Sequence, residues 1–436
     1  MNLTETYLLV AVMLAVVAVV SVLFKGKSGM IAPFIFVAGL ITALVAGLGF
    51  RLREVTEGPF VYVDTLMWVL CGAIFSYMLY ANGTFQFIFQ KVAARNRGPA
   101  AQMFILILFI GIPGMLTGTV MASVATTGLM AGRFLLDKGL EKSKVVEVVT
   151  VGAVFGMLLP PLCLPAMATT IARQNLYPGA FEGYFLPILI LTLPALIVYC
   201  ALSGRRVLGE LNVEDGAKVE QSGSAVCLIP LAVVALLVLG YNFLYFLIPY
   251  YGGYPVIYVI GIVLALIFKC KGANPLITAA DGVRTVAIEL ALILGLASMI
   301  ETFRLVGVSG TLSAQLEIAG VSATVIGVTM GILVLIAGLL GTPFAYAVGA
   351  LAVYLTSNAN YSSASFLCTM ALGAAIAVSM LLALRGGLAE SVCETLGITG
   401  VTGPQVAKRN IIPILVLIVT IVVFLAAGPQ LVFLMI

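Results

Sequence analysis

Long apolar runs alternate with short polar breaks along the whole chain. Most of the runs approach the ~20 residues that a membrane-spanning helix needs. The longest polar stretch, residues 204–224, falls near the middle and predicts a cytoplasmic linker between two halves. The pattern predicts membrane-spanning helices near residues 6–24, 30–50, 60–80, 145–171 and 183–203 in the first half, and near residues 225–248, 254–269, 285–304, 365–395 and 411–433 in the second.

Two further apolar stretches, residues 101–132 and 320–356, occupy corresponding places in the two halves. The first carries Pro113, Gly114 and Gly118 near its centre, and as a single helix it would be too long. As two arms of about a dozen residues each, neither arm crosses the ~30 Å of hydrocarbon. We therefore expect each stretch to dip into the bilayer and turn back as a re-entrant hairpin.

The distribution of cations supports the first hairpin. If residues 101–132 return to their own side, the cluster from Arg133 to Lys144 and most of the 22 lysines and arginines share one face of the membrane. An excess of cations marks the cytoplasmic side. The opposite face receives only Arg51, Arg53, Arg173 and Arg304, with Arg385 near a helix break.

These counts define the expected fold class. It is an all-α polytopic membrane protein with about ten transmembrane helices and two re-entrant hairpins. Each half has an odd number of crossings, so the second half is inverted relative to the first, and both termini are extracytoplasmic. The repeats are residues 1–203, with hairpin 101–132 and broken helix 145–171, and residues 225–436, with hairpin 320–356 and broken helix 365–395.

Composition agrees with a chain covered by lipid. Hydrophobic residues make up 62% of the 436 residues and charged residues only 9%, too little polar surface for a soluble protein of this size. Histidine is absent, which removes the machinery of zinc proteases and of Ser-His-Asp catalysis. No basic run suggests nucleic acid. We expect a protein of the inner (plasma) membrane that is not an enzyme.

The segment GMLLPPLCLPAMATT, residues 156–170, interrupts one predicted span with Pro160 and Pro161. A proline within a helix costs roughly 3 kcal/mol, and irregular backbone at membrane depth persists only where protein or a water-filled cavity covers it. Many secondary transporters build ion and substrate sites from such broken helices. A kink without function is the alternative interpretation.

Several polar side chains are candidates for substrate binding. The hydroxyls are those of Thr126 and Thr127 in the first hairpin and of Thr169 and Thr170 after the proline break. Each hydroxyl is equally suited to satisfying helix backbone in lipid.

Arg385 stands beside Gly386 and Gly387, two glycines that can unwind the second broken helix. A cation inside a membrane is costly and usually functional, here as a partner for a substrate carboxylate. The alternatives are snorkelling to the cytoplasmic face, or pairing with Glu390 or Glu394.

Two stretches resemble a known family, the large membrane subunit of tripartite ATP-independent periplasmic (TRAP) transporters of the ion transporter superfamily. Residues 118–170, GTVMASVATTGLMAGRFLLDKGLEKSKVVEVVTVGAVFGMLLPPLCLPAMATT, contain a glycine- and serine-rich hairpin, a basic turn and a Pro-Pro break. Residues 398–419, ITGVTGPQVAKRNIIPILVLIV, resemble the family's ending.

The resemblance implies an elevator transporter with Na⁺ as coupling ion and an organic acid as substrate. It implies a first ion site at Gly118, Thr119, Pro160 and Pro161 and a second at Gly338, Thr342, Gly386 and Gly387. It also implies two partners, a small four-helix membrane subunit and an extracytoplasmic substrate-binding protein.

The chain departs from the family at the second site. Thr342 stands where the family usually has an acidic residue, Gly386 and Gly387 replace a second Pro-Pro, and Arg385 replaces a threonine. A cation fixed at Arg385 could take the place of a mobile one.

The leading hypothesis is therefore Na⁺-coupled uptake of a small organic anion, a carboxylate, by the large permease subunit of a TRAP-type system. The first alternative is a stand-alone anion or Na⁺/H⁺ exchanger of the same superfamily that works without a binding protein. A passive channel is the second alternative, which paired interrupted helices disfavour.

Overall fold

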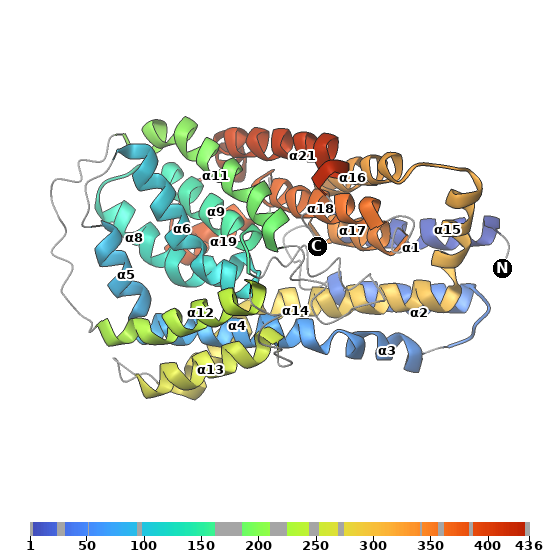
Figure 1. The fold of residues 1–436 in the computed structure, drawn as a ribbon, viewed down its shortest axis with the longest axis horizontal. Coiled ribbons are helices and arrows are strands. Elements are labelled where there is room, and N and C mark those ends of the chain that lie inside the picture. The colour runs from blue at the N-terminus through green and yellow to red at the C-terminus, as the bar shows by residue number, and fades with distance from the viewer. Residues whose placement is uncertain are drawn as a thin grey trace.

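The computed structural model describes most of the chain, and every regular element within the described residues is a helix (Figure 1). The described residues are 3–23, 31–50, 52–93, 98–161, 185–209, 225–243, 253–268, 274–340, 342–355, 362–382 and 387–431.

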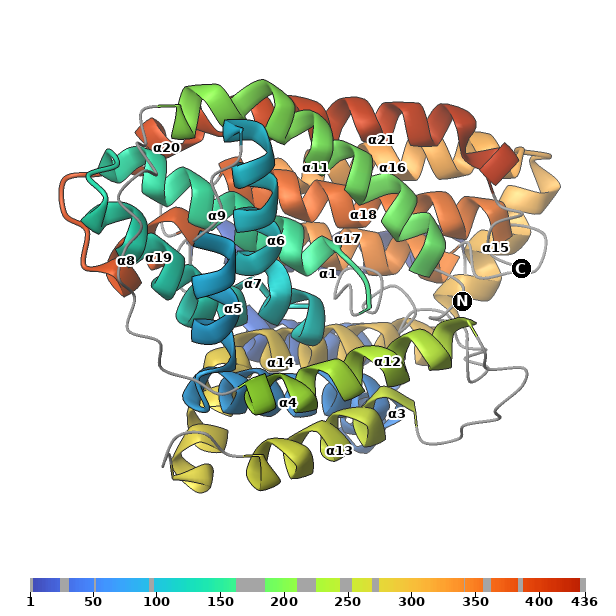
Figure 2. The same ribbon diagram turned by 60° about the vertical axis from the view of Figure 1, so that its left-hand side comes forward.

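The helices form two layers that lie one against the other (Figures 1 and 2). The first layer, lower in Figure 1, is built around α14, which packs against α2, α3 and α4, while α13 packs on α4 and α12 on α13. Its helices are α2 (Ile31–Val45), α3 (Leu52–Val61), α4 (Val63–Ala81), α12 (Ile229–Phe243), α13 (Gly253–Ile267) and α14 (Pro275–Val306).

The second layer holds both predicted hairpins and both predicted broken helices, with α6 packed on α9 and α16 on α18. Its elements are α6 (Pro99–Thr117), α7 (Val120–Ser123), the π-helical turn η2 (Val124–Gly128), α8 (Leu129–Asp137), α9 (Lys142–Leu158), α11 (Phe185–Leu208), α16 (Ala323–Leu340), α17 (Thr342–Leu355), α18 (Ser362–Leu382), α19 (Leu388–Leu396), α20 (Gly403–Arg409) and α21 (Ile411–Leu431).

Three elements connect the layers. Helix α1 contacts α2 in the first layer and α17 in the second. Helix α5 bends away from α4 by 68° and carries Phe89, whose ring packs against Phe109 of α6 and Phe134 of α8. The connecting elements are α1 (Leu3–Leu23), α5 (Thr84–Ala93) and α15 (Val308–Ile318). The 3₁₀ turn η4 (Ala225–Leu228) precedes α12 and contacts α5.

Helix length identifies fewer complete spans than the ten or so expected from the sequence. Among the described residues, α6, α11 and α14 are long and apolar enough to cross a membrane. Counting the bent pairs α4–α5 and α20–α21 as single spans raises the number to five. Helix α14, with 32 residues, is longer than the predicted span 285–304.

The first hairpin differs in length from its expected form. Its first arm, α6, has 19 residues and not about a dozen, so the expectation that neither arm could cross a membrane by length is wrong for α6. The return arm runs through α7, η2 and α8.

Both ends of the first hairpin lie at the same end of the bundle. Ala100, at the start of α6, lies against Gly204 near the end of α11. Two residues later Arg206 pairs with Glu147 near the start of α9, and α9 follows α8 after a short turn. The same end thus gathers the basic ends of α11 and α20. Re-entry into a membrane remains a prediction.

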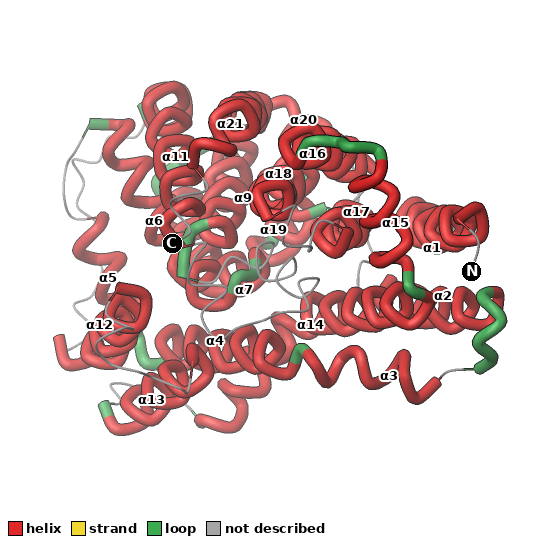
Figure 3. The backbone as a smooth tube through the Cα atoms, turned by 45° about the vertical axis from the view of Figure 1, so that its right-hand side comes forward, coloured by secondary structure: helices red, strands yellow, loops and turns green. Residues whose placement is uncertain are grey.

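In the second half, α16 and α17 pack against each other and both pack against α18 (Figure 3). The predicted break within residues 365–395 falls between Leu382, the last residue of α18, and Leu388, the first of α19. The predicted linker begins later than residue 204, because α11 continues to Leu208. The inverted relation between the halves also remains a prediction.

Candidate functional site

The tip of the first hairpin is a tight glycine turn. Helix α6 ends at Thr117, and Gly118 follows with φ 71°, a left-handed conformation that glycine adopts without strain. The Thr117 hydroxyl donates to the Pro113 carbonyl at 2.8 Å and lies 3.0 Å from the Thr119 hydroxyl. Thr117 and Thr119 are fully buried, so the tip gathers oxygen atoms in an otherwise apolar core.

Hydroxyls of the return arm complete hydrogen bonds beside the proline of α6. Pro113 has no N–H, and the next backbone N–H, that of Gly114, donates to the Ser123 hydroxyl at 2.8 Å. The Thr127 hydroxyl donates to the Ile110 carbonyl at 2.8 Å. The two arms are therefore joined by side chains that satisfy backbone groups around the proline.

The structure gives the predicted ligands Thr126 and Thr127 a role in the hairpin itself. Both are fully buried, and the Thr126 hydroxyl donates to the Ala122 carbonyl at 2.6 Å. Substrate binding by these two residues stays a prediction.

We expect Thr127→Val to lower the free energy of unfolding by about 1–3 kcal/mol, because the buried Ile110 carbonyl loses its side-chain donor. Thermal melting in detergent, followed by size-exclusion chromatography, measures the loss. Thr420→Val is the matched control, since Thr420 bonds only to the Val416 carbonyl one turn back on its own helix. Equal melting temperatures for the two variants would contradict the structural role of Thr127.

Glycines bring α6 and α9 into backbone contact. A Cβ atom added to Gly156 would lie 2.5 Å from the Cα and 2.6 Å from the carbonyl oxygen of Gly111. A Cβ added to Gly114 would lie 2.9 Å from the carbonyl carbon of Gly156. Small residues allow such close helix packing in membranes, and here they hold the hairpin against the end of the broken helix.

Helix α9 ends at the proline pair identified in the sequence. Leu159 is extended, and the Pro160–Pro161 peptide bond is cis. Neither proline has an N–H, so the carbonyls four residues earlier, those of Gly156 and Met157, have no helical donor. The peptide group between Gly156 and Met157 lies beside Gly114, one turn before the hairpin tip. The predicted first ion-site residues thus stand on neighbouring segments, since α7, which follows Thr119, also contacts α9.

The tip also touches the first layer. A Cβ added to Gly72 of α4 would lie 2.2 Å from the Leu116 carbonyl oxygen and 3.4 Å from the Thr117 Cα. The backbone of α4 therefore rests on the hairpin tip, which lies between the two layers.

The second predicted ion site is described only in part. The Thr342 hydroxyl, at the start of α17, lies 3.0 Å from the hydroxyl of Ser379 near the end of α18. Gly387 is the extended residue immediately before α19. Gly338 lies within α16, and nothing is described of its surroundings. Four predicted site residues lie outside the described residues, namely Arg385, Gly386, Thr169 and Thr170.

The two broken helices meet each other. Helix α9 contacts α18 and α19, and α19 also contacts η2 of the first hairpin. Helix α8 also packs closely on α19, because a Cβ added to Gly132 of α8 would lie 2.7 Å from the Leu396 side chain at the end of α19. Both helix breaks and the first hairpin therefore belong to one packed unit.

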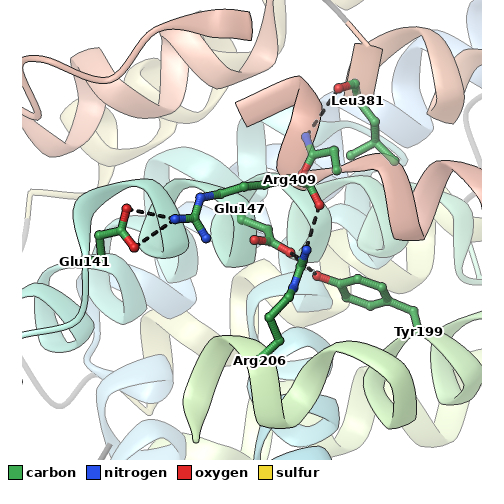
Figure 4. A network of polar contacts seen from close by, with 7 residues as sticks. Glu141, Glu147, Tyr199, Arg206, Leu381 and Arg409 are labelled. Carbon is green, nitrogen blue, oxygen red and sulfur yellow. Dashed lines mark hydrogen bonds and ion pairs between the residues drawn. The ribbon is translucent and has the colours of Figure 1, made fainter. Parts of the chain in front are cut away.

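A buried carboxylate anchors the start of α9 to α11 (Figure 4). Glu147 is fully buried and pairs with Arg206, and it also accepts a hydrogen bond from the Tyr199 hydroxyl at 3.3 Å. Arg206 donates in addition to the Arg409 carbonyl at 3.2 Å. Arg409 in turn binds both oxygens of Glu141 at 2.8 Å. This network joins α9, α11 and α20.

The same network reaches the second break. The Asn410 side chain donates to the Leu381 carbonyl near the end of α18 at 3.2 Å. At the exposed rim, the Ser143 hydroxyl and then Arg409 hold the pKa of the Glu141 carboxyl below its usual value. The stabilisation is present above the unfolded-state pKa and is lost as the pH falls through the lowered value.

Any ion at this site would be held by oxygen atoms of the backbone and of hydroxyls. Within the described residues, no three His, Cys, Asp or Glu side chains lie close enough together to hold a metal ion. The hydroxyls of Thr117 and Thr119 and the carbonyls of Gly156 and Met157 are neutral oxygen donors of the kind that replace the hydration shell of a monovalent cation.

Comparison with solved structures identifies the fold. The chain matches the YdaH transporter of Alcanivorax borkumensis with a TM-score of 0.65 and 15% identity, over 93% of this chain and 98% of that one. It matches MtrF of Neisseria gonorrhoeae, from a class of antimetabolite efflux pumps, with a TM-score of 0.57 and 12% identity, over 93% and 96%. The chain shares the fold of these two proteins.

No protein-family model and no curated protein matches the sequence. The shared fold and the apolar helices together make this a membrane-embedded protein. The specific resemblance to TRAP large subunits, the inner-membrane location and the extracytoplasmic termini stay predictions.

Reasoning from the sequence missed several residues around the breaks. Ser123 stands on the return arm of the first hairpin, and a serine that faces a mid-helix proline can replace the missing hydrogen-bond partner. Ser379 had no such signal. Glu147 and Arg206 are 59 residues apart, and each stands near the end of a predicted span, where solvation is the ordinary expectation.

Proposed function

We propose that this chain is a secondary active transporter in which the second layer carries a small organic anion past the first. One observation carries the proposal: in a fold shared with two transport proteins, the hairpin tip at Gly118 lies between α4 of one layer and the broken helix α9 of the other. A broken helix and a hairpin tip at the boundary between two bundles are the parts from which alternating-access sites are built.

Sodium is the proposed coupling ion. The residues around the first break supply neutral oxygen donors, and helix α19 begins directly after the second break, which directs backbone N–H groups toward an anion. Arg385 is the proposed partner of a substrate carboxylate. In this scheme the sodium ion is cargo that moves with the substrate.

The leading form of the proposal is uptake by a TRAP-type system with a four-helix subunit and an extracytoplasmic binding protein. A second form, a stand-alone exchanger, gains support from the comparisons. The match extends over 98% and 96% of the two similar chains, one of which is described as an efflux pump.

Reconstitution separates these forms. The purified chain is placed in liposomes with an inward Na⁺ gradient, and uptake of a panel of labelled organic acids is measured. Uptake by the chain alone supports the stand-alone form, whereas uptake that requires the two partner proteins supports the TRAP-type form. Equal flux with and without ion gradients would contradict secondary active transport and favour a channel.

Movement between the layers can be tested without a substrate. In Gly72→Ala, the added methyl group collides with the Leu116 carbonyl. Overpacking costs about 1–3 kcal/mol. This cost destabilises only the conformational state in which α4 packs against the hairpin tip. We expect amide hydrogen exchange of residues 113–123 to rise about tenfold, equivalent to ~1.4 kcal/mol, with little change in melting temperature.

The matched control is Gly240→Ala in α12, where an added Cβ meets nothing within 4 Å. A large loss of melting temperature in Gly72→Ala, without faster exchange at the tip, would mean that the two layers form one rigid core.

A further inference from the structure

Glu289 lies at the middle of α14, the 32-residue helix of the first layer. A helix of this length is about 48 Å long, so its central residues lie at the depth of the hydrocarbon core. An ionised carboxylate at that depth is costly, and such residues ordinarily mark ion or proton pathways. The residues proposed to bind sodium and substrate do not include Glu289.

The position of Glu289 on its helix makes it internal. The residues three before it, four after it and seven on either side share its helical face, and all four are buried: Val286, Ile293, Gly282 and Leu296. Part of the Glu289 side chain is accessible, but its Oε2 atom is buried and has no hydrogen-bond partner. A carboxylate shares its charge over both oxygens, so ionisation would leave half of that charge on an atom with neither water nor a donor beside it.

Polar residues lead from the end of α14 to Glu289. Asp281, Thr285 and Glu289 follow each other at intervals of four residues, so they lie along one helical face. The Thr285 hydroxyl lies 2.6 Å from the Tyr77 hydroxyl of α4 and 2.9 Å from the Asp281 carbonyl. Asp281 is half exposed and pairs with Arg284 at 3.6 Å. The row therefore starts at solvent, at the end of α14 predicted to be cytoplasmic.

Within the described residues, no ion pair joins Glu289 to a cation from the helices that pack on α14. Helices α2 and α7 contribute no titratable side chain, and the side chains of Glu54 and Asp64 lie outside the described part. The remaining titratable groups on α14 itself and on its neighbours are Asp281, Arg284, Glu301, Arg304, Arg53, Glu57, Tyr62, Cys71, Tyr77, Tyr80, Glu317, Tyr346 and Tyr354.

We propose that Glu289 is a protonation site inside the membrane, reached along Asp281 and Thr285. A proton fits the site better than Na⁺ does, because one carboxyl group neutralises itself by binding a proton, whereas a bare cation needs several oxygen ligands. Proton binding at Glu289 accompanies the transport cycle, and this second part rests on the proposed function. Contacts of α14 with α7 and α17 give the helix a direct link to the moving layer.

Carbodiimide labelling tests the site independently of transport. Dicyclohexylcarbodiimide reacts with protonated carboxyl groups in apolar surroundings, and mass spectrometry locates the adduct in the purified full chain. We expect labelling of Glu289 at neutral pH that decreases as the pH is raised, and no labelling of the exposed Glu57. Infrared difference spectra between neutral and alkaline pH are expected to show a protonated-acid C=O band that Glu289→Gln removes.

Three results would overturn the proposal. Absence of both the adduct and the infrared band would mean that Glu289 is ionised throughout. If NaCl, but not choline chloride, protects Glu289 from carbodiimide labelling, Glu289 belongs to a sodium site. If the site protonates but a proton gradient drives no uptake of any organic acid that a sodium gradient does drive, the link to transport is wrong while the proposed function stands.

Discussion

Arg206→Met is expected to lower the free energy of unfolding by about 3 kcal/mol or more, because it leaves Glu147 without its cation. Removing one partner of a buried ion pair costs ~3–5 kcal/mol. The Glu147 side chain is 0% exposed and that of Arg206 37%, so the loss should fall toward the lower end of this range. Equilibrium unfolding in detergent measures it.

Two further variants isolate the charge. The double variant Glu147→Gln with Arg206→Met removes both members of the pair and should recover part of the stability, since no uncompensated charge remains. Arg53→Ala is the matched surface control, because Arg53 and Glu57 pair at 2.7 Å while 86% and 54% exposed, and it should cost less than about 1 kcal/mol. Equal losses for Arg206→Met and Arg53→Ala would show that Glu147 is solvated.

Gly156→Ala should lower the free energy of unfolding by a similar amount, through a steric clash and not through an unpaired charge. The added methyl group would lie 2.5 Å from the Cα and 2.6 Å from the carbonyl oxygen of Gly111. Because both atoms belong to the backbone, α6 and α9 must move apart to make room for it. Overpacking costs ~1–3 kcal/mol and occasionally more, and we expect about 3 kcal/mol in the melting experiment.

The control for this variant is again Gly240→Ala, which should be neutral or slightly stabilising, because alanine favours helix over glycine by roughly 0.5–1 kcal/mol. Unlike Gly72, Gly156 lies within a single layer, so its substitution should destabilise every conformational state. A normal melting temperature for Gly156→Ala, with altered exchange only at the hairpin tip, would show that α6 and α9 separate during the cycle.

The sequence predicts the positions of the breaks better than the lengths of the helices. Gly118 and the Pro160–Pro161 pair were identified because glycine and proline alter the backbone locally. Pro113 stands near the centre of the predicted hairpin, but α6 continues through it, since Ser123 and Thr127 supply hydrogen bonds there. That compensation depends on tertiary contact and leaves little trace in the sequence.

Charged residues near helix ends also make helix boundaries hard to predict from the sequence. Asp281 and Arg284 interrupt the apolar run, so the span was predicted to begin at residue 285, whereas α14 begins at Pro275 and carries both residues on its exposed first turns. The pairing of Glu147 with Arg206 depends on how α9 and α11 pack, which hydrophobic periodicity does not specify.

The hydrogen bonds that Ser123 and Thr127 make around Pro113 also bear on biosynthesis. Because both donors and acceptors belong to residues 110–127, the element can satisfy its own polar backbone before the C-terminal half has been synthesised. During synthesis, the first hairpin can therefore enter lipid with these backbone groups already hydrogen-bonded. The helices synthesised later then pack around it.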